Sequence, residues 1–185
     1  MSKKNRLLPL LETALIASFA MSLSLIPDFA SWFSPSFGAI PLIIFSLRKG
    51  VKFGFLAGLI WGSLHFVLGK VYYLSLSQVI IEYLLAFLVM GASGLFAQSY
   101  QQSLKNQQIN KAIFLAILGS LLAVILRYTF HFIAGIIFWG NYAPKGISPF
   151  LYSLTVNGIA GLLTLSFVII SVIIVTKKFS KIILS

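Results

Sequence analysis

The sequence has no cysteine, two histidines and three acidic residues, Glu12, Asp28 and Glu82. The absence of cysteine excludes disulfides and thiol chemistry. A zinc or haem site is poorly supported as well, because two histidines and three scattered carboxylates do not supply a clustered ligand set. We therefore expect no metal and no cofactor.

Charged residues make up only 9% of the chain, whereas 59% of its residues are hydrophobic and its mean hydropathy is +1.00. These values lie far outside the range of soluble globular domains and predict an integral membrane protein. A formal charge of +11 would suggest a nucleic-acid partner in a soluble domain. Here the basic residues stand between apolar runs, which favours membrane lipid as the partner and no nucleic acid.

The apolar residues form six segments, and we predict an all-α membrane protein in which residues 1–185 form a single domain of six transmembrane helices. The segments span residues 7–26, 37–47, 51–69, 75–98, 112–139 and 150–176. The second is too short to cross a hydrocarbon core of about 30 Å at about 1.5 Å per residue without help from its neighbours. The first follows a basic amino terminus, as in a signal peptide. It is longer than a signal core and no small-x-small cleavage site follows, so we expect it to be retained.

Basic residues lie mainly on one side of this layout. If the amino terminus is cytoplasmic, that side receives eleven of the 14 Lys and Arg residues: Lys3, Lys4, Arg6, Arg48, Lys49, Lys52, Lys105, Lys111, Lys177, Lys178 and Lys181. The outer side receives Lys70 and Lys145, and Arg127 lies within the fifth segment. This bias predicts that both termini are cytoplasmic.

The fifth segment carries ionisable groups inside its apolar run. Arg127, His131, Gly135 and Trp139 recur at a spacing of four, so they follow one stripe that drifts by about 40° per step. An ionisable group at hydrocarbon depth is costly and normally faces the interior of the bundle or a wet cavity. The stripe is therefore expected to line a cavity, in which Gly135 leaves room for a flat group.

Most of the unusual polar and aromatic residues fall in the outer half of this topology. They are Glu82, His131, Tyr152 and Asn157 within the helices, and Trp32, Tyr72 and Trp139 at the outer ends or loops. This convergence predicts a cavity that opens to the outside.

Several of these residues also have a purely structural interpretation. Glu82 can form a buried ion pair with Arg127 instead of receiving a cationic ligand. His131 and Asn157 can be interhelical hydrogen-bonding residues, and Trp139 can belong to an interfacial aromatic belt. Their common depth favours a ligand site, in which the indole offers a face to a cation.

Small residues mark one face of the first segment. Ala14 and Ser18 form this face, and Ala17 widens it. Such a face suits either packing within the bundle or contact with another membrane protein.

Three further features have a structural interpretation only. Gly54, Gly58 and Gly62 are expected to allow close helix packing. His65 is expected at the membrane interface, and the Gln-rich stretch 99–111 is expected to form a cytoplasmic loop.

Specific motifs occur in segments four to six. They are residues 74–78 (LSLSQ) followed by 82–83 (EY), residues 130–139 (FHFIAGIIFW), and residues 152–158 (YSLTVNG). Together with residues 46–50 (SLRKG) and the six-segment layout, they closely resemble the thiamine-binding S-component of energy-coupling factor (ECF) transporters. The resemblance covers essentially the whole chain.

The resemblance implies a function and a set of partners. S-components of that family bind their vitamin tightly near the extracellular face of the bacterial cytoplasmic membrane and catalyse no reaction. They dock through a small-residue motif on the first helix onto a transmembrane coupling protein with two cytoplasmic ATPases. Here Ala14 and Ser18 would stand at that docking face, with Ser18 in place of the second alanine that is usual in the family.

The resemblance also implies roles for individual residues. Glu82 would meet the cationic ligand and Trp139 would stack on its thiazolium ring. The aminopyrimidine would be hydrogen-bonded by Tyr83, His131, Tyr152 and Asn157, and the loops would close the site with Trp32 and Tyr72. Arg127 stands where the family can have a lysine, and Ser36 where a relative has an acid.

We therefore expect a high-affinity thiamine-binding subunit that delivers thiamine for ATP-driven uptake by an associated coupling module. The chain has no phosphate-binding loop of the form G-x-x-x-x-G-K-[ST], so the energy is expected from that partner. The alternative is a proton-coupled solo transporter of a small organic cation, with Glu82, Arg127 and His131 as a relay. An intramembrane hydrolase is disfavoured, because no nucleophile, metal set or oxyanion arrangement accompanies Glu82 and His131.

Overall fold

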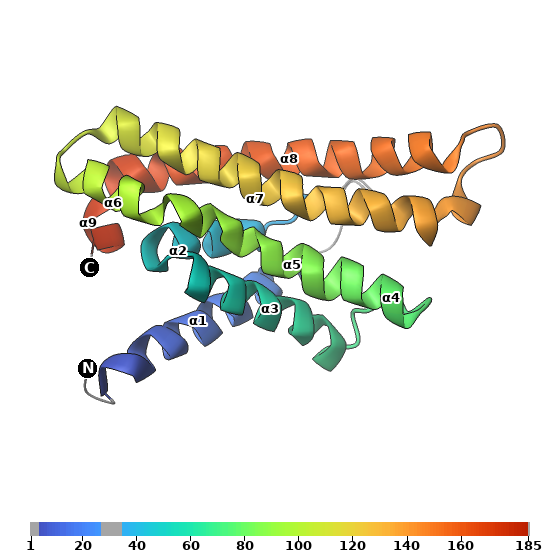
Figure 1. Cartoon of the computed structure of the whole chain (residues 1–185), viewed down its shortest axis with the longest axis horizontal. Coiled ribbons are helices and arrows are strands. Elements are labelled where there is room, and N and C mark those ends of the chain that lie inside the picture. Colours follow the sequence, from blue (N-terminus) through green and yellow to red (C-terminus); the bar gives the residue numbers. More distant parts are fainter. Residues whose placement is uncertain (1–3, 27–34, 185) are drawn as a thin grey trace.

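The computed structural model describes residues 4–26 and 35–184, in which all regular secondary structure is helical (Figure 1). The helices are α1 (Lys4–Leu23), α2 (Ala39–Lys49), α3 (Val51–Val67), α4 (Leu76–Val79), η2 (Ile80–Leu85), α5 (Ala86–Leu88), η3 (Val89–Phe96), α6 (Ala97–Lys105), α7 (Ile109–Ile137), η4 (Gly140–Tyr142), α8 (Pro149–Lys178) and α9 (Ser180–Leu184). The elements from α4 to α6 follow one another without a break and form one helical span, in which η2 is a π-helix and η3 a 3-10 helix.

Three helices are long and apolar enough to cross a membrane. They are the span Leu76–Lys105, α7 and α8, each of 29 or 30 residues with a mean hydropathy between 2.1 and 2.7. The apolar parts of α1 and α3 are shorter, and α2 has 11 residues. The predicted all-α membrane fold is confirmed, and each of the six predicted segments corresponds to a helical stretch.

The structure corrects the predicted loop over residues 99–111. Helix α6 continues to Lys105 and α7 begins at Ile109, so only residues 106–108 lie between them. The side chains of Tyr100 and Leu104 are buried, and the Tyr100 hydroxyl lies 3.0 Å from that of Thr176 on α8. Gln, Ser and Lys residues are compatible with a helix, and the buried side chains of Tyr100 and Leu104 pack the polar end of α6 against the bundle.

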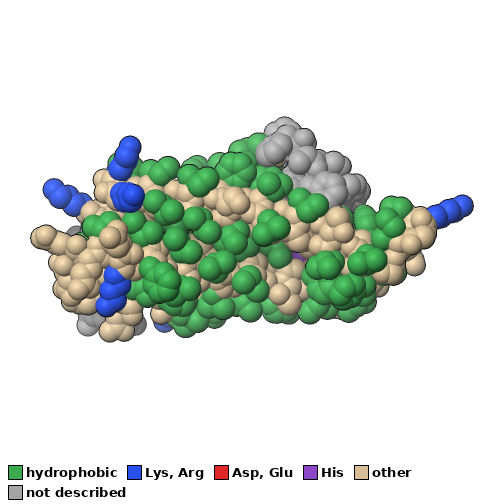
Figure 2. Space-filling view, turned by 90° about the horizontal axis from the view of Figure 1, so that it is seen from above, with side chains coloured by type: hydrophobic (Ala, Val, Ile, Leu, Met, Phe, Trp, Pro, Cys, Tyr) green, Lys and Arg blue, Asp and Glu red, His purple; other side chains and the backbone are tan. Residues whose placement is uncertain are grey.

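Both described ends of the chain lie at the same end of the molecule (Figure 1). On the face shown in Figure 2, hydrophobic side chains cover the flank and basic side chains gather mainly at that end. This is the distribution expected of a protein whose flank faces lipid and whose basic end faces the cytoplasm.

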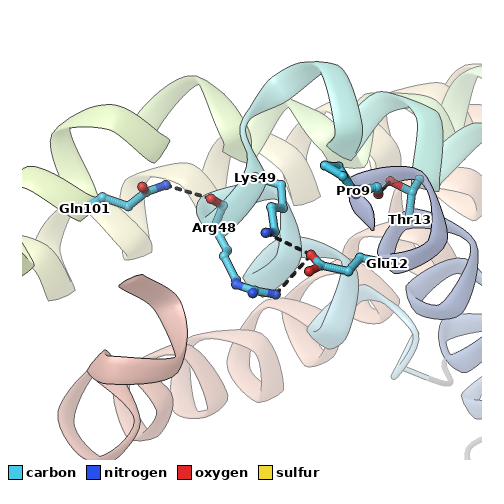
Figure 3. A network of polar contacts seen from close by, with 6 residues as sticks. All are labelled: Pro9, Glu12, Thr13, Arg48, Lys49 and Gln101. Atoms are coloured by element: carbon cyan, nitrogen blue, oxygen red, sulfur yellow. Dashed lines mark hydrogen bonds and ion pairs between the residues drawn. The ribbon is translucent and has the colours of Figure 1, made fainter. Parts of the chain in front are cut away.

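A polar network ties three elements together at this end of the molecule (Figure 3). Glu12 Oε2 on α1 lies 3.2 Å from Arg48 Nη1 and 2.9 Å from Lys49 Nζ, both on α2. From α6, Gln101 Nε2 donates to the carbonyl oxygens of Leu47 and Arg48 at 3.1 and 2.8 Å. The network joins α1, the end of α2 and α6.

Helix α3 packs against the span Leu76–Lys105 along a seam of direct main-chain contact, which we call the glycine seam. Gly54 faces Gly91, Gly58 faces the carbonyl of Phe87, and Gly62 faces the carbonyl of Tyr83. A Cβ on any of these three glycines of α3 would overlap its neighbours. The predicted close packing is confirmed, and the seam fixes the position of η2 along α3.

Helix α1 has one buried face and one exposed face. Thr13, Ala17 and Met21 are buried, whereas Ala14 and Ser18 are exposed. Ala17 does not widen the face formed by Ala14 and Ser18 as predicted, because it is 0% exposed and belongs to the hydrophobic core. Ala14 and Ser18 do lie on the open side of the helix.

Candidate functional site

A cavity of ≈ 270 Å³ lies between the span Leu76–Lys105, α7 and α8, toward the end of the bundle away from the termini. We call it the Glu82 cavity. It is lined by Tyr72, Glu82, Tyr83, Phe87, His131, Gly135, Trp139, Tyr152, Ser153, Val156 and Asn157. The structure thus brings together eight residues that the sequence singles out, from three helices and two loops.

Glu82 lies in η2, the π-helical turn of the span. A π-helix widens the helix locally and often occurs at functional sites. The carboxylate of Glu82 accepts a hydrogen bond from the Trp139 indole at 2.7 Å on Oε1 and one from the Gln78 amide on Oε2. Two neutral donors from different parts of the chain therefore hold the carboxylate of a residue that is only 9% exposed.

Gln78 positions Glu82 although it does not line the cavity. Its Oε1 accepts from the backbone N–H of Leu74 at 3.1 Å, which leaves Nε2 directed at the carboxylate. The Ser75 hydroxyl accepts from the backbone N–H of Gln78 at 3.1 Å and begins the helix at this point. The sequence LSLSQ thus serves as a helix cap and as a support for the carboxylate.

Aromatic rings form one wall of the cavity. The Trp139 and Tyr72 rings meet edge to face, with centroids 6.1 Å apart. The backbone N–H of Tyr72 donates to the Tyr83 hydroxyl at 3.0 Å, which ties the loop before α4 to η2. Rings held in this way offer faces to a flat or cationic ligand.

The opposite wall is formed where α7 meets α8. A Cβ on Gly135 would overlap the Ser153 hydroxyl, so this glycine allows the two helices to approach closely. Ser153 donates to the carbonyl of Phe132 at 2.7 Å, and Asn157 Nδ2 donates to the Ser153 carbonyl at 3.1 Å. Phe87, Ser153 and Val156 were missed by the sequence reasoning, although Ser153 lies one turn before Asn157 on the same helix face.

Arg127 lies outside the Glu82 cavity. Its guanidinium carbon is 4.1 Å from the centroid of the Phe87 ring and 4.9 Å from that of Trp61. It lines a second cavity of ≈ 240 Å³, the Arg127 cavity, which shares Phe87, His131 and Asn157 with the first. The suggested ion pair between Glu82 and Arg127 does not occur, because the hydrogen-bond partners of Glu82 in the described chain are Gln78 and Trp139.

Two other expectations concern His65 and Trp32. His65 is buried rather than interfacial, with Nδ1 3.0 Å from the Trp61 carbonyl and its ring 4.6 Å from that of Phe87. The prediction of an interfacial position is wrong because hydropathy does not distinguish the lipid side of a helix from its protein side. Trp32, predicted to close the site, lies outside the described residues.

The arrangement suits the binding of a cation. In the part of the chain that the structure describes, no basic side chain pairs with Glu82 and no three His, Cys, Asp or Glu side chains cluster as a metal site would require. A buried carboxylate without a cationic partner favours a ligand that brings positive charge. The fold and the cavity together define a multi-pass helical membrane protein with a polar and aromatic cavity within its bundle.

Comparison with known proteins narrows this class. The chain belongs to the family described as thiamine transporter protein (Thia_YuaJ), whose model matches residues 10–184. It is 37% identical over 181 residues to thiamine transporter ThiT of Lacticaseibacillus paracasei, covering 94% of this chain and 90% of that protein. It is 30% identical over 178 residues to thiamine transporter ThiT of Bacillus subtilis, covering 94% and 92%. These relatives are named as transporters, not as enzymes.

A solved structure has the same fold. ThiT from Listeria monocytogenes superposes with a TM-score of 0.92 at 41% sequence identity, covering 97% of this chain and 98% of that one.

Proposed function

We propose that the chain binds thiamine in the Glu82 cavity and delivers it across the bacterial cytoplasmic membrane. The observation that carries this proposal is the Glu82 carboxylate, buried among aromatic rings with neutral donors alone, in a chain of the thiamine transporter family. Thiamine has a permanently charged thiazolium ring and an aminopyrimidine. It therefore needs one carboxylate, aromatic faces and mixed hydrogen-bonding groups.

The cavity provides these groups and has a volume suited to a small molecule. Its ≈ 270 Å³ lies near the lower end of small-molecule pockets, at about 300–1,000 Å³. Glu82 would neutralise the ligand cation, Trp139 and Tyr72 would contact its rings, and Tyr152 and Asn157 would hydrogen-bond the pyrimidine. Binding of this kind breaks no bond, so the chain acts as a binding subunit and not as an enzyme.

Transport would be driven by a partner. We propose that the chain is the S-component of an ECF transporter and assembles with a transmembrane coupling protein and two cytoplasmic ATPases. The exposed side of α1, with Ala14 and Ser18 between Leu11, Leu15 and Phe19, offers an apolar face for the coupling protein. Both termini would be cytoplasmic, in keeping with their position at the basic end of the molecule.

Equilibrium binding tests the first part of the proposal. The purified full chain, without nucleotide or pH gradient, is expected to bind thiamine with saturable quenching of its tryptophan fluorescence, because Trp139 lines the cavity. A titration without a saturable response would reject thiamine as the ligand.

Reconstitution tests the second part. Vesicles that hold this chain with the coupling protein and both ATPases are expected to accumulate thiamine when ATP is supplied, whereas vesicles with this chain alone are not. Introducing tryptophan at Ala14 is expected to stop uptake and leave thiamine binding intact. Uptake by the chain alone under a proton gradient would instead indicate the proton-coupled alternative.

A further inference from the structure

Arg127 is a buried cation without a polar partner. It is 6% exposed, and its Nε and Nη1 have no hydrogen-bond partner in residues 4–26 and 35–184. The rings of Phe87 and Trp61 contact the guanidinium and stabilise it in part through their π-faces. Its hydrogen-bonding capacity is left unsatisfied, which is costly in a dry environment.

The acids of the described chain do not neutralise this charge. Glu12 lies in the network at the other end of the molecule with Arg48 and Lys49. Glu82 is held by neutral donors on the Glu82 cavity side. A membrane-embedded cation normally has a partner or a wet cavity, so the partner of Arg127 is expected to come from outside the described part of the chain.

Arg127 lines a space that is large enough for such a partner. The Arg127 cavity has a volume of ≈ 240 Å³, several times the roughly 30 Å³ that one water molecule occupies in the liquid. Its lining comprises Leu23, Ser24, Ile26, Pro35, Ser36, Phe37, His65, Phe87, Arg127, Tyr128, His131, Asn157 and Ala160. Among the described residues, its lining therefore holds two histidines and an arginine but no acid.

Two of the hydroxyl groups that face this cavity, those of Ser24 and Tyr128, are already engaged. Ser24 donates to the Ala20 carbonyl at 2.9 Å and accepts from the Trp61 indole at 3.0 Å. The Tyr128 hydroxyl lies 2.7 Å from the hydroxyl of Thr164. Among the described residues of this lining, the fully buried polar atoms without a hydrogen-bond partner are Nε and Nη1 of Arg127, and a charged donor of this kind favours an acceptor with negative charge.

We propose that the Arg127 cavity is a binding site for a small inorganic anion such as chloride, held by Nε and Nη1 of Arg127. The site is separate from the Glu82 cavity and does not depend on thiamine as the ligand there. Because Phe87, His131 and Asn157 line both cavities, an anion in one and a cation in the other attract each other across a shared wall. Binding at either site is then expected to strengthen binding at the other by the same factor.

Iodide quenching measures the site directly. Trp61 is 0% exposed and lies against Arg127, so iodide in bulk solution does not reach it, whereas iodide bound to the guanidinium quenches it as a heavy atom. The probe is the full chain with Trp32→Phe and Trp139→Phe, which leaves Trp61 as its single tryptophan. We expect quenching that saturates with iodide and is reversed by chloride.

Two added substitutions test what holds the anion. Arg127→Met is expected to abolish the saturable phase and to remain folded, because an apolar side chain replaces an unpaired buried charge. Asp28→Asn is expected to leave the phase unchanged. The proposal is overturned if quenching rises linearly with iodide concentration in the probe that retains Arg127. It is also overturned if the probe with Arg127→Met shows the same quenching as the probe that retains Arg127. It is also overturned if Asp28→Asn strengthens iodide binding, since Asp28 would then be the occupant.

Two measurements on the unaltered chain do not depend on these variants. At constant ionic strength, replacing gluconate by chloride is expected to raise the melting temperature, because an anion that binds only the folded state stabilises it. An unchanged melting temperature would overturn the site. The second measurement rests on the proposed function: thiamine affinity is expected to rise about fivefold or more in chloride. If thiamine binds with equal affinity in both salts, the coupling between the two sites is overturned. If iodide quenching saturates but thiamine does not bind, the proposed function is rejected and the anion site is supported.

Discussion

Glu12 is partly buried and Glu82 is buried, and the two carboxylates have opposite kinds of partner. At the basic end, the side chain of Glu12 is 21% exposed and contacts two cations, Arg48 and Lys49. Near the other end, Glu82 is 9% exposed and is held by the uncharged amide of Gln78 and the indole of Trp139.

This difference distinguishes an acid that has a structural role from an acid that is free to bind a cationic ligand. The charge of Glu12 is neutralised within the protein, so it can only tie α1 to α2. The donors of Glu82 fix the position of its oxygens without cancelling their charge. A preorganised charge of this kind costs stability in the free protein and contributes affinity when a cation arrives.

The largest expected effect comes from neutralising the unpaired carboxylate. Glu82→Gln should weaken thiamine binding by about 2–4 kcal/mol, or roughly 30- to 1000-fold, because a cation then loses its buried counter-charge. Isothermal titration of the purified chain measures this change. Glu12→Gln is the matched control and should bind thiamine with the affinity of the parent. Equal losses of affinity in the two variants would contradict the distinction between the two acids.

A smaller effect is expected from the residue that positions the carboxylate. Gln78→Met keeps the length of the side chain but removes the donor to Glu82, and should weaken thiamine binding by about 1 kcal/mol, or roughly fivefold. Gln101→Met makes the same change in the network at the basic end and should leave the affinity unaltered. If both variants bind like the parent, Gln78 does not set the geometry of Glu82.

The smallest effect is expected at the neutralised acid. Glu12→Gln should lower the melting temperature by about 1–3 °C, because partly exposed ion pairs contribute less than about 1 kcal/mol. Thermal unfolding monitored by circular dichroism measures it, and raised salt should reduce the difference between variant and parent. A much larger loss would show that the α1–α2 contact supports the whole bundle.

Glu82, His131 and Trp139 could be predicted from the sequence because polar groups are rare in its apolar segments. Each such residue must face protein, and a topology fixed by basic residues is enough to place them at one depth. The π-helical turn that presents Glu82 could not be predicted in this way, because its residues IIEYLL are as compatible with an α-helix.

Ala17, His65 and Arg127 show where such reasoning fails. Lipid and protein interior are both apolar, so hydropathy does not fix the rotation of a helix about its own axis. The sequence therefore could not show that Ala17 is buried while Ala14 is exposed. It also could not show that His65 is buried in the bundle and not at the membrane interface. That Arg127 faces a cavity of its own follows from how Phe87 and Trp61 pack around it, which is a tertiary property.

The glycine seam limits how the chain can change in length. Each added residue turns a helix by about 100°, so one insertion in α3 or in the span from α4 to η3 would turn every glycine beyond it away from its opposite main chain. The connection between them, residues 68–75, is mostly exposed and carries no such constraint. Insertions and deletions between Gly50 and Gly94 should therefore be tolerated in that connection alone, and only where they leave Tyr72 within reach of Tyr83.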